Sequence, residues 1–215
     1  MKILFNDVIQ YSNAPDAIKS PMLSDITNFS DPISIMIIFD KPRRINSIGI
    51  GNTDGTTFTI NGQAIYFSRN GLYLFNEITA GNITINHNAT RIGRIAAGMA
   101  VDIPTSITKE PAFCSTAEPR TTLSGQVIPG AGGYNYRTLS LDSRYKIGKA
   151  AISEIDEGYK YIGMGYPFFL DLSDEAYKLP FSKLYATEAN QRKMGFESGV
   201  RKFLYSRRFE FRECF

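Results

Sequence analysis

The single histidine of the chain, His87, is the first candidate for chemistry, because histidine is the most frequent general acid or base in enzymes. It ends an alternating segment, residues 83–87, and its neighbours are Asn86 and Asn88. A catalytic histidine needs a nucleophile or an orienting group beside it, and the sequence marks no such partner. We therefore predict a structural or surface role for His87.

The two cysteines, Cys114 and Cys214, could hold a metal or form a disulfide. They lack CxxC spacing, and together with one histidine they make no plausible zinc set. We expect two free, at least partly buried thiols. A Cys114–Cys214 disulfide remains an alternative, because strands can bring distant positions together, although its geometry is restrictive.

Three carboxylates, Asp171, Asp174 and Glu175, lie close together in the sequence and are of the type used in glycoside hydrolysis and calcium binding. Spacing alone does not bring paired carboxylates together in space, and no EF-hand loop is present. Asp54 lies in a turn cluster at residues 51–55, Gly-Asn-Thr-Asp-Gly. An Asx turn explains Asp54 more simply than calcium, which is left as the alternative.

The glycine-rich segment at residues 129–133, Pro-Gly-Ala-Gly-Gly, resembles a phosphate-binding loop only in composition. It lacks the Lys-Ser/Thr of a P-loop, and the residues after it have a strand pattern, whereas a phosphate loop precedes a helix. We interpret it as a turn or loop that becomes ordered against a neighbouring subunit.

The densest basic region contains two pairs, Arg201-Lys202 and Arg207-Arg208. Adjacent residues of a strand point to opposite faces, so neither pair makes one basic patch. We expect Arg207 to stack on a ring or to pair with a carboxylate. No catalytic, cofactor-binding or metal-binding residue can be assigned, and we predict that the chain is not an enzyme.

The elements that would position these residues are mainly strands. Residues 31–62 contain three extended segments: alternating isoleucines from Ile33 to Phe39, a second segment around Ile48, and a third with Phe58 and Ile60. Residues 40–42 and 51–55 are predicted to separate them, and Asn61-Gly62 has the sequence of a hairpin turn. This rhythm is typical of a β-sandwich.

Further strands are predicted over 3–9, 64–67, 72–75, 83–87, 91–99, 123–128, 134–145, 166–172, 181–186 and the alternating C-terminus, with one helix over 147–157 capped by Gly158. The prolines that begin at Pro104 favour a boundary near Ser106. We predict a mostly-β chain: an N-terminal jelly-roll β-sandwich, residues 1–105, followed by a second β-rich domain, residues 106–215, with one short helix.

The composition excludes several classes of protein. A net charge of +3 is too small for a typical nucleic-acid binder. No signal-peptide core and no run of about 18 apolar residues are present, so we expect a soluble protein without a membrane span. Without a secretory signal, the sequons at Asn28, Asn82 and Asn88 are interpreted as chance.

The 31–62 block resembles the central strands of galactose-binding-like (discoidin-like) jelly rolls. The matching residues are Ile45, Ile48 and Ile50, followed by the 51–55 turn cluster. The resemblance covers residues 1–105 and implies a sandwich with a ligand-side loop. Residues 51–56 contain no aromatic side chain, which argues against sugar stacking on that loop.

A broader resemblance, to virion structural proteins of tailed bacteriophages, rests on phrases along most of the chain, including IGIGNTDGTTFTING, RIGRIAAGM, PRTTLSGQVIPGAGGY and FLYSRRFEFRE. It implies a tail, tail-tip or baseplate component in the virion, assembled in the host cytoplasm. Its partners would be other virion tail proteins, with several copies in a symmetric assembly. The alternative function is a carbohydrate-binding module for host-surface glycan recognition.

Overall fold

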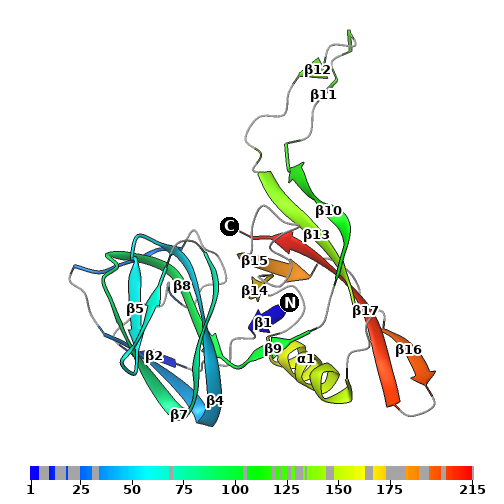
Figure 1. The fold of residues 1–215 in the computed structure, drawn as a ribbon. Coiled ribbons are helices and arrows are strands. Elements are labelled where there is room, and N and C mark those ends of the chain that lie inside the picture. Colours follow the sequence, from blue (N-terminus) through cyan, green and yellow to red (C-terminus); the bar gives the residue numbers. More distant parts are fainter. Residues whose placement is uncertain are drawn as a thin grey trace.

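The computed structural model describes residues 1–4, 10–12, 18, 25–30, 34–67, 70–103, 106–117, 120–121, 123–124, 127–128, 133, 135–143, 148–162, 167–172, 183–188, 194–199 and 202–214. Across these residues the chain is mostly β, with one helix, α1 (Lys149–Ile162). The strands form two large antiparallel sheets and one small ribbon (Figure 1). The mostly-β fold with a β-sandwich and one short helix is therefore confirmed.

The first sheet has the order β3-β8-β4-β7-β5-β6, with β2 also paired to β4. Its strands are β2 (Gln10–Ser12), β3 (Thr27–Asn28), β4 (Ile35–Thr53), β5 (Thr57–Ile60), β6 (Gln63–Tyr66), β7 (Gly71–His87) and β8 (Arg91–Gly98). The sheet folds around one apolar core to form the sandwich at the left of Figure 1.

Alternation builds this core. Ile35, Ile37 and Phe39 of β4 are buried, and the residues between them are partly exposed. Ile83 and Ile85 of β7 pair with Ile37 and Ile35 in register, so both strands send their side chains to the same interior. Period-two patterning places every second side chain on one face, which is why the sequence predicted these strands.

Two long strands replace four shorter predicted ones. The prediction that residues 40–42 end the first segment is wrong: β4 runs unbroken through Asp40-Lys41-Pro42, with a register shift against β7 between Ile38 and Arg43. The predicted segments at 72–75 and 83–87 are likewise one strand, β7. A bulge accommodates the proline, because it leaves extra residues outside the hydrogen-bonded ladder.

The Asn61-Gly62 hairpin is confirmed, since both residues have positive φ, 46° and 82°, and join β5 to β6. The type I′ turn needs this left-handed backbone at both central positions. The 51–55 cluster is confirmed in part: Thr53 ends β4, and residues 54–56 form the connection to β5.

The second sheet has the order β10-β13-β17-β15-β14-β1-β9, with β16 paired to β17. Its strands are β1 (Lys2–Leu4), β9 (Ala100–Asp102), β10 (Ser106–Ser115), β13 (Asn135–Asp142), β14 (Phe168–Asp171), β15 (Lys183–Glu188), β16 (Met194–Gly199) and β17 (Lys202–Glu213). The small ribbon is β11 (Arg120–Thr121) with β12 (Val127–Ile128).

The division predicted at Ser106 does not coincide with the division between the sheets. Strands β1 and β9 precede Ser106, and β1 pairs with both β9 and β14 in the second sheet. Ile3 of β1 is buried in the core of that sheet together with Leu170 and Phe211. The first residues of the chain therefore complete the sheet built mainly from its second half.

The helix is longer at its C-terminus than predicted. α1 begins at Lys149 and continues through Gly158 to Ile162, so the prediction of Gly158 as its cap is wrong. Ile155 anchors the helix in the core of the second sheet, and Ala151 packs against that core. An interior glycine costs a helix about 1 kcal/mol, which the following turn and tertiary packing can offset.

An apolar cluster joins the two sheets: Leu4, Leu72, Ala96, Ala100, Phe169 and Tyr185. The rings of Phe169 and Tyr185 lie 4.6 Å apart between centroids. A Cβ on Gly49 of β4 would lie 2.1 Å from Cδ2 of Phe169, so the glycine lets this ring lie directly on the sandwich backbone. Close contact of this kind is a recurrent reason for glycine within a strand.

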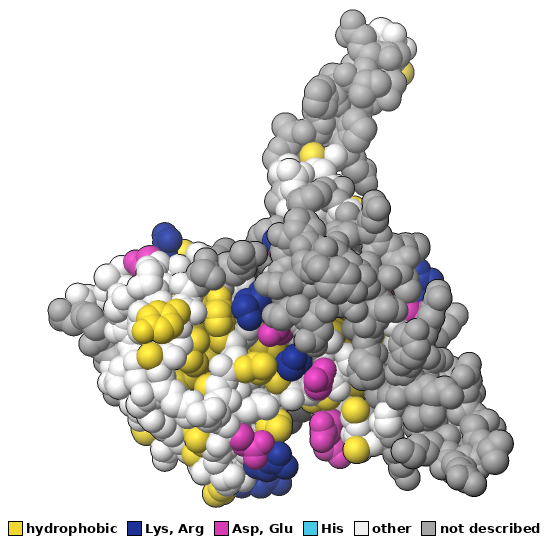
Figure 2. Space-filling view, viewed as in Figure 1, with side chains coloured by type: hydrophobic (Ala, Val, Ile, Leu, Met, Phe, Trp, Pro, Cys, Tyr) yellow, Lys and Arg dark blue, Asp and Glu magenta, His cyan; other side chains and the backbone are white. Residues whose placement is uncertain are grey.

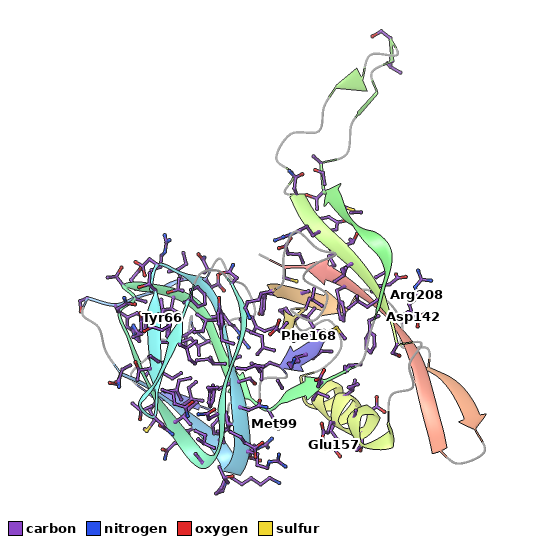
Figure 3. The ribbon with its side chains drawn as sticks, viewed as in Figure 1. Tyr66, Met99, Asp142, Glu157, Phe168 and Arg208 are labelled. Carbon is purple, nitrogen blue, oxygen red and sulfur yellow. The ribbon has the colours of Figure 1, made fainter. Side chains whose placement is uncertain are left out.

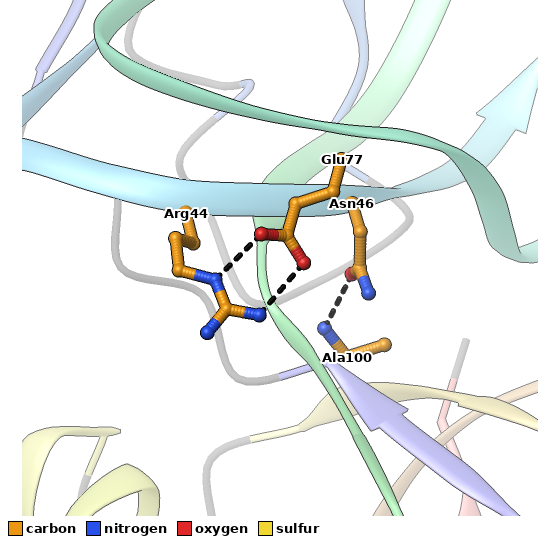
Figure 4. Close-up of polar contacts among 4 residues, drawn as sticks. All are labelled: Arg44, Asn46, Glu77 and Ala100. Atoms are coloured by element: carbon orange, nitrogen blue, oxygen red, sulfur yellow. Dashed lines mark hydrogen bonds and ion pairs between the residues drawn. The ribbon is translucent and has the colours of Figure 1, made fainter.

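Polar contacts reinforce this junction (Figure 4). The backbone N–H of Ala100, at the start of β9, donates to Oδ1 of Asn46 in β4 at 2.8 Å. Nearby, the Arg44 guanidinium donates to both carboxylate oxygens of Glu77, at 2.6 and 2.8 Å, and ties β4 to β7. The Asn46–Ala100 hydrogen bond thus fixes the chain at the point where it leaves the sandwich and enters the second sheet.

Candidate functional site

His87 lies in the core of the sandwich. Its side chain is buried, its ring lies 4.8 Å from that of Phe29 in an edge-on arrangement, and the Phe58 ring is 6.0 Å away. Its Nδ1 lies 3.1 Å from the carbonyl oxygen of Ala89, and its Nε2 has no hydrogen-bond partner among the described residues. Aromatic packing and one backbone contact give this histidine a structural position.

Burial lowers the pKa of His87, while the Ala89 carbonyl and the nearby Asp54 carboxylate oppose that shift. The imidazole is therefore neutral in the folded chain at neutral pH. With Nδ1 protonated and donating to Ala89, the structure explains both the tautomer and the orientation of the ring. Among the residues that the structure describes, no nucleophile contacts His87.

Asp54 closes the end of the sandwich. Its Oδ1 accepts hydrogen bonds from the backbone N–H groups of Thr90 and Arg91, at 3.0 and 2.9 Å, and its Oδ2 accepts from the Thr90 hydroxyl at 2.5 Å. The carboxylate thus caps the turn between β7 and β8. These donors occupy the oxygens that a calcium ion would need, which argues against the calcium alternative. They belong to the turn between β7 and β8, so the bonds are not those of the predicted Asx turn within residues 51–55.

The hydrogen bond from the Thr90 hydroxyl, together with the two backbone donors, lowers the pKa of Asp54, and burial of the carboxylate opposes this shift. A carboxyl with a lowered folded-state pKa stabilises the fold above its unfolded pKa, and this contribution is lost as pH falls through the folded pKa. Asp54 therefore contributes to stability at neutral pH and loses that contribution in acid.

Asn88 organises the same end of the sandwich. Its Oδ1 accepts from the backbone N–H groups of Thr56 and Thr57, at 2.9 and 3.1 Å, and its Nδ2 donates to the Thr56 hydroxyl at 2.9 Å. Asn88 thus binds the loop at residues 54–56 through hydrogen bonds to Thr56, and Asp54 of that loop binds the turn at residue 90 in the same way. The loops at this end of the sandwich are consequently held together by hydrogen bonds to one another.

Asp171 belongs to the junction between the sheets. It is buried and lies 3.6 Å from Nζ of Lys183, which also donates to the carbonyl of Leu72 and lies 4.4 Å above the Tyr73 ring. The lysine links the second sheet to β7 of the sandwich. Asp174 and Glu175, the other two carboxylates of the predicted group, lie outside the described residues.

The basic pairs do not form an anion site in the described part of β17. Arg208 is exposed, and its Nε lies 3.3 Å from Oε1 of Glu210. Arg201 and the side chains of Lys202 and Arg207 lie outside what the structure describes. A neighbouring arginine, Arg212, stacks 4.0 Å above the Tyr136 ring, the kind of contact expected for Arg207.

Cys114 and Cys214 are free thiols, as the sequence predicted. Cys114 lies on β10 and Cys214 directly follows β17, and β13 lies between these two strands in the sheet. Tyr136 of β13 is the register partner of Cys114. An intervening strand separates neighbours by about 10 Å, beyond the reach of a disulfide, so that alternative is wrong.

Within the part of the chain that the structure describes, no three His, Cys, Asp or Glu side chains gather in a metal-binding arrangement. None of its helical residues form a segment long and apolar enough to cross a membrane. Most of the glycine-rich 129–133 segment lies outside the described residues. Among the described candidates, His87, Asp54 and Asp171 are engaged in contacts within the fold.

Sequence reasoning missed two features. It did not single out Tyr66 on β6, whose side chain is 78% exposed (Figure 3), or the junction built by Gly49, Phe169 and Lys183. Tyr66 directly follows the apolar Ile65 in the predicted strand, which was a usable signal, since alternation along a strand places neighbouring side chains on opposite faces. The junction had no local signal, because Gly49 lies more than 100 residues before Phe169 and Lys183.

No protein-family model and no curated protein matches the chain. Among solved structures, the chain has a weak likeness to a protein described as a pectin-binding carbohydrate-binding module. The two are 16% identical, the match covers 46% of this chain and 96% of the other, and the TM-score is 0.34. A likeness at this level carries no functional argument here.

Proposed function

We propose that the chain is a structural component of a bacteriophage virion, in the tail, tail tip or baseplate, and that it acts by binding other proteins without catalysis. The sequence segments that resemble tailed-phage structural proteins are the reason for proposing a tailed-phage particle. The observation that carries an assembly role is the pair of β-ribbons that project from the second sheet (Figure 1).

The first projecting ribbon is formed by β16 and the first half of β17. Residues 202–207 of β17 pair with β16 alone among the described strands, whereas residues 208–213 pair with β13 or β15. This ribbon therefore extends beyond the body of the sheet. A two-stranded ribbon is marginally stable by itself in water and gains stability from a third strand or from packing.

The second projecting ribbon lies beyond the ends of β10 and β13. Strands β11 and β12 pair only with each other among the described strands, and Figure 1 shows them far from either core. Leu123, between the two strands, is fully exposed at this tip. A neighbouring subunit would cover this apolar side chain and supply the packing that the ribbon lacks.

Unpaired strand edges of this kind join subunits readily, because their backbone N–H and C=O groups accept another strand. A monomeric protein normally shields such edges. Two projecting ribbons at different places on the sheet would connect one copy to at least two neighbours, which is the requirement for a ring or collar. We expect several copies in a symmetric assembly with other tail proteins.

The alternative, a carbohydrate-binding module for host-surface glycans, gains nothing from the loop at residues 54–56. Asp54 and Asn88 use their side chains to close that loop, and no aromatic side chain is present in it. A glycan site at the position implied by the galactose-binding-like resemblance is therefore unsupported.

Purified particles of the phage that encodes the chain would test the proposal. We expect mass spectrometry to find the protein in the particles and immunogold electron microscopy to place it at one position along the tail. Antibody against the tail tube would serve as the control for labelling. Abundant protein in infected cells with none in washed particles would overturn the virion role.

A further inference from the structure

The outer face of β5, β6 and β7 carries a row of side chains fixed by strand register. Thr57 pairs with Tyr66, Thr59 pairs with Ala64, and Thr59 also pairs with Asn86 on its other side. Register partners point to the same face of a sheet. Their strand neighbours Phe58, Ile65 and Ile85 are buried in the core, so this row faces outward.

Tyr66 provides an exposed ring at the margin of this face. Its side chain is 78% exposed, the largest exposure among the aromatic residues described (Figure 3). The adjacent Ile65 and Phe67 are buried and hold the strand against the core. The ring is thus displayed on a rigid strand and has an open face, which is the arrangement that allows stacking on an apolar ligand face.

Uncharged hydrogen-bonding groups lie on the same face, on β5 and β7, the next two strands of the sheet from β6. Asn86 accepts a hydrogen bond from the Ser34 hydroxyl through Oδ1, which fixes its orientation and leaves the Nδ2 amide hydrogens as donors. Thr59 is partly exposed, and Thr84, two residues before Asn86 on the same face of β7, is exposed. Each hydroxyl can both donate and accept, as the hydroxyls of a sugar can.

The face lacks ionic side chains. Residues 55–66 and 78–90, which include β5, β6 and the second part of β7, contain no Asp, Glu, Lys or Arg. In Figure 2 the charged side chains of the sandwich gather at its upper and lower margins, and the surface between them is white and yellow. An uncharged face of this kind favours a neutral ligand over an acidic polymer or a nucleic acid.

We propose that this face binds a neutral carbohydrate. The ring of Tyr66 stacks on the apolar face of one sugar, and Thr57 and Thr59 of the neighbouring strand hydrogen-bond to its hydroxyls. Asn86, one strand farther across the face, hydrogen-bonds to the next sugar of an oligosaccharide. The spacing of neighbouring strands, about 4.8 Å, matches the scale of a single sugar ring. The site is separate from the loop at residues 54–56 and from both projecting ribbons, so it does not depend on the assembly role.

A strand from another protein is a different occupant of the same region, because β6 is an edge strand. Such a strand would bind the backbone of Ala64 and Tyr66 in the plane of the sheet and would not need the tyrosine ring. The exposed ring and the polar row out of that plane favour the carbohydrate. The two occupants differ in their response to substitution of Tyr66.

The test uses the full chain on a printed array of neutral and uronic-acid-containing glycans, with titration of the strongest ligand. We expect neutral glycans to bind.

Tyr66→Ala should weaken binding at least about tenfold, because it removes the stacking surface, and Tyr66→Phe should retain most of the affinity. Asn86→Ala should weaken it several-fold. Leu74→Ala is the matched control, since Leu74 is also exposed, at 44%, but lies on another part of β7.

Thermal unfolding of each variant would confirm that it is folded, which is expected because all three positions are exposed. Absence of binding to any neutral glycan by the folded chain would overturn the proposal. So would equal binding by Tyr66→Ala and the wild type, or selective binding of uronic-acid glycans. These outcomes do not depend on whether the protein is found in virions, so the carbohydrate proposal can fail while the virion role holds, and the reverse.

Discussion

At the scale of single residues, the side chains of the types used in catalysis and metal binding make contacts that stabilise the sandwich. His87 is a buried, neutral core residue, and Asp54 caps a turn with three hydrogen bonds. Both pKa values are lowered, by burial for the histidine and by hydrogen bonds for the carboxylate. Their protonation therefore affects stability, each in its own range of pH.

The only histidine allows a clean pH experiment. Because burial lowers the pKa of His87, the unfolded chain binds its proton first as pH falls below about 6.5, and the native state loses stability. We expect the free energy of unfolding in urea to fall as the pH is lowered from 7 to 5.5. His87→Gln should flatten this slope, and an equal slope in both proteins would contradict the core assignment.

At the scale of elements, the junction between the sandwich and the second sheet depends on one close contact. The Phe169 ring of β14 lies on Gly49 of β4, and Tyr185 of β15 packs on that ring. Lys183 adds an ion pair with Asp171 and a hydrogen bond to Leu72. Burying two aromatic rings between sheets favours one fixed arrangement of the two parts of the chain.

Gly49→Ala tests this contact. The new methyl group overlaps the Phe169 ring, so we expect the free energy of unfolding to fall by about 1–3 kcal/mol, measured by urea denaturation. Gly81→Ala on β7 is the control and should be near neutral, because its Cβ would meet nothing closer than 3.8 Å. Adding Phe169→Leu to Gly49→Ala should recover part of the loss. Equal stability of the two alanine variants would argue against the junction.

The same elements show what the sequence can and cannot predict. Alternation identified β13 correctly, since Leu139 and Leu141 are buried, and turn chemistry located Asn61-Gly62. Both signals are local. The pairing of β1 with β14 joins residues 167 positions apart (Ile3 with Leu170), and no local pattern encodes such a partner. A bulge at residues 40–42 also kept β4 continuous where proline suggested an end.

Site prediction was limited for the same reason. Sequence reasoning predicted a structural or surface role for His87, because no partner motif accompanied it, and the structure places the side chain in the core. It could not anticipate that Asp171 would be paired with Lys183 in the junction, because that contact needs β14 and β15 to be neighbours. The outward row around Tyr66 likewise appears only after β5, β6 and β7 are placed side by side.

At the scale of the whole molecule, two well-packed cores carry ribbons that extend away from them (Figure 1). Strands β4 and β8 pair within the sandwich over many residues, whereas β16 and residues 202–207 of β17 pair only with each other in the described structure. Local stability follows packing, so the ribbons belong to the low-stability part of the molecule until a partner covers them.

Hydrogen exchange measured on the isolated chain and on the chain within purified particles tests this role most directly. We expect the amides of β4 and β8 to be protected in both samples. The amides of β16 and of residues 202–207 should exchange rapidly in the isolated chain and become protected at least about tenfold in particles, because neighbouring subunits cover the ribbon. The same rapid exchange of these amides in both samples would contradict assembly through the ribbons.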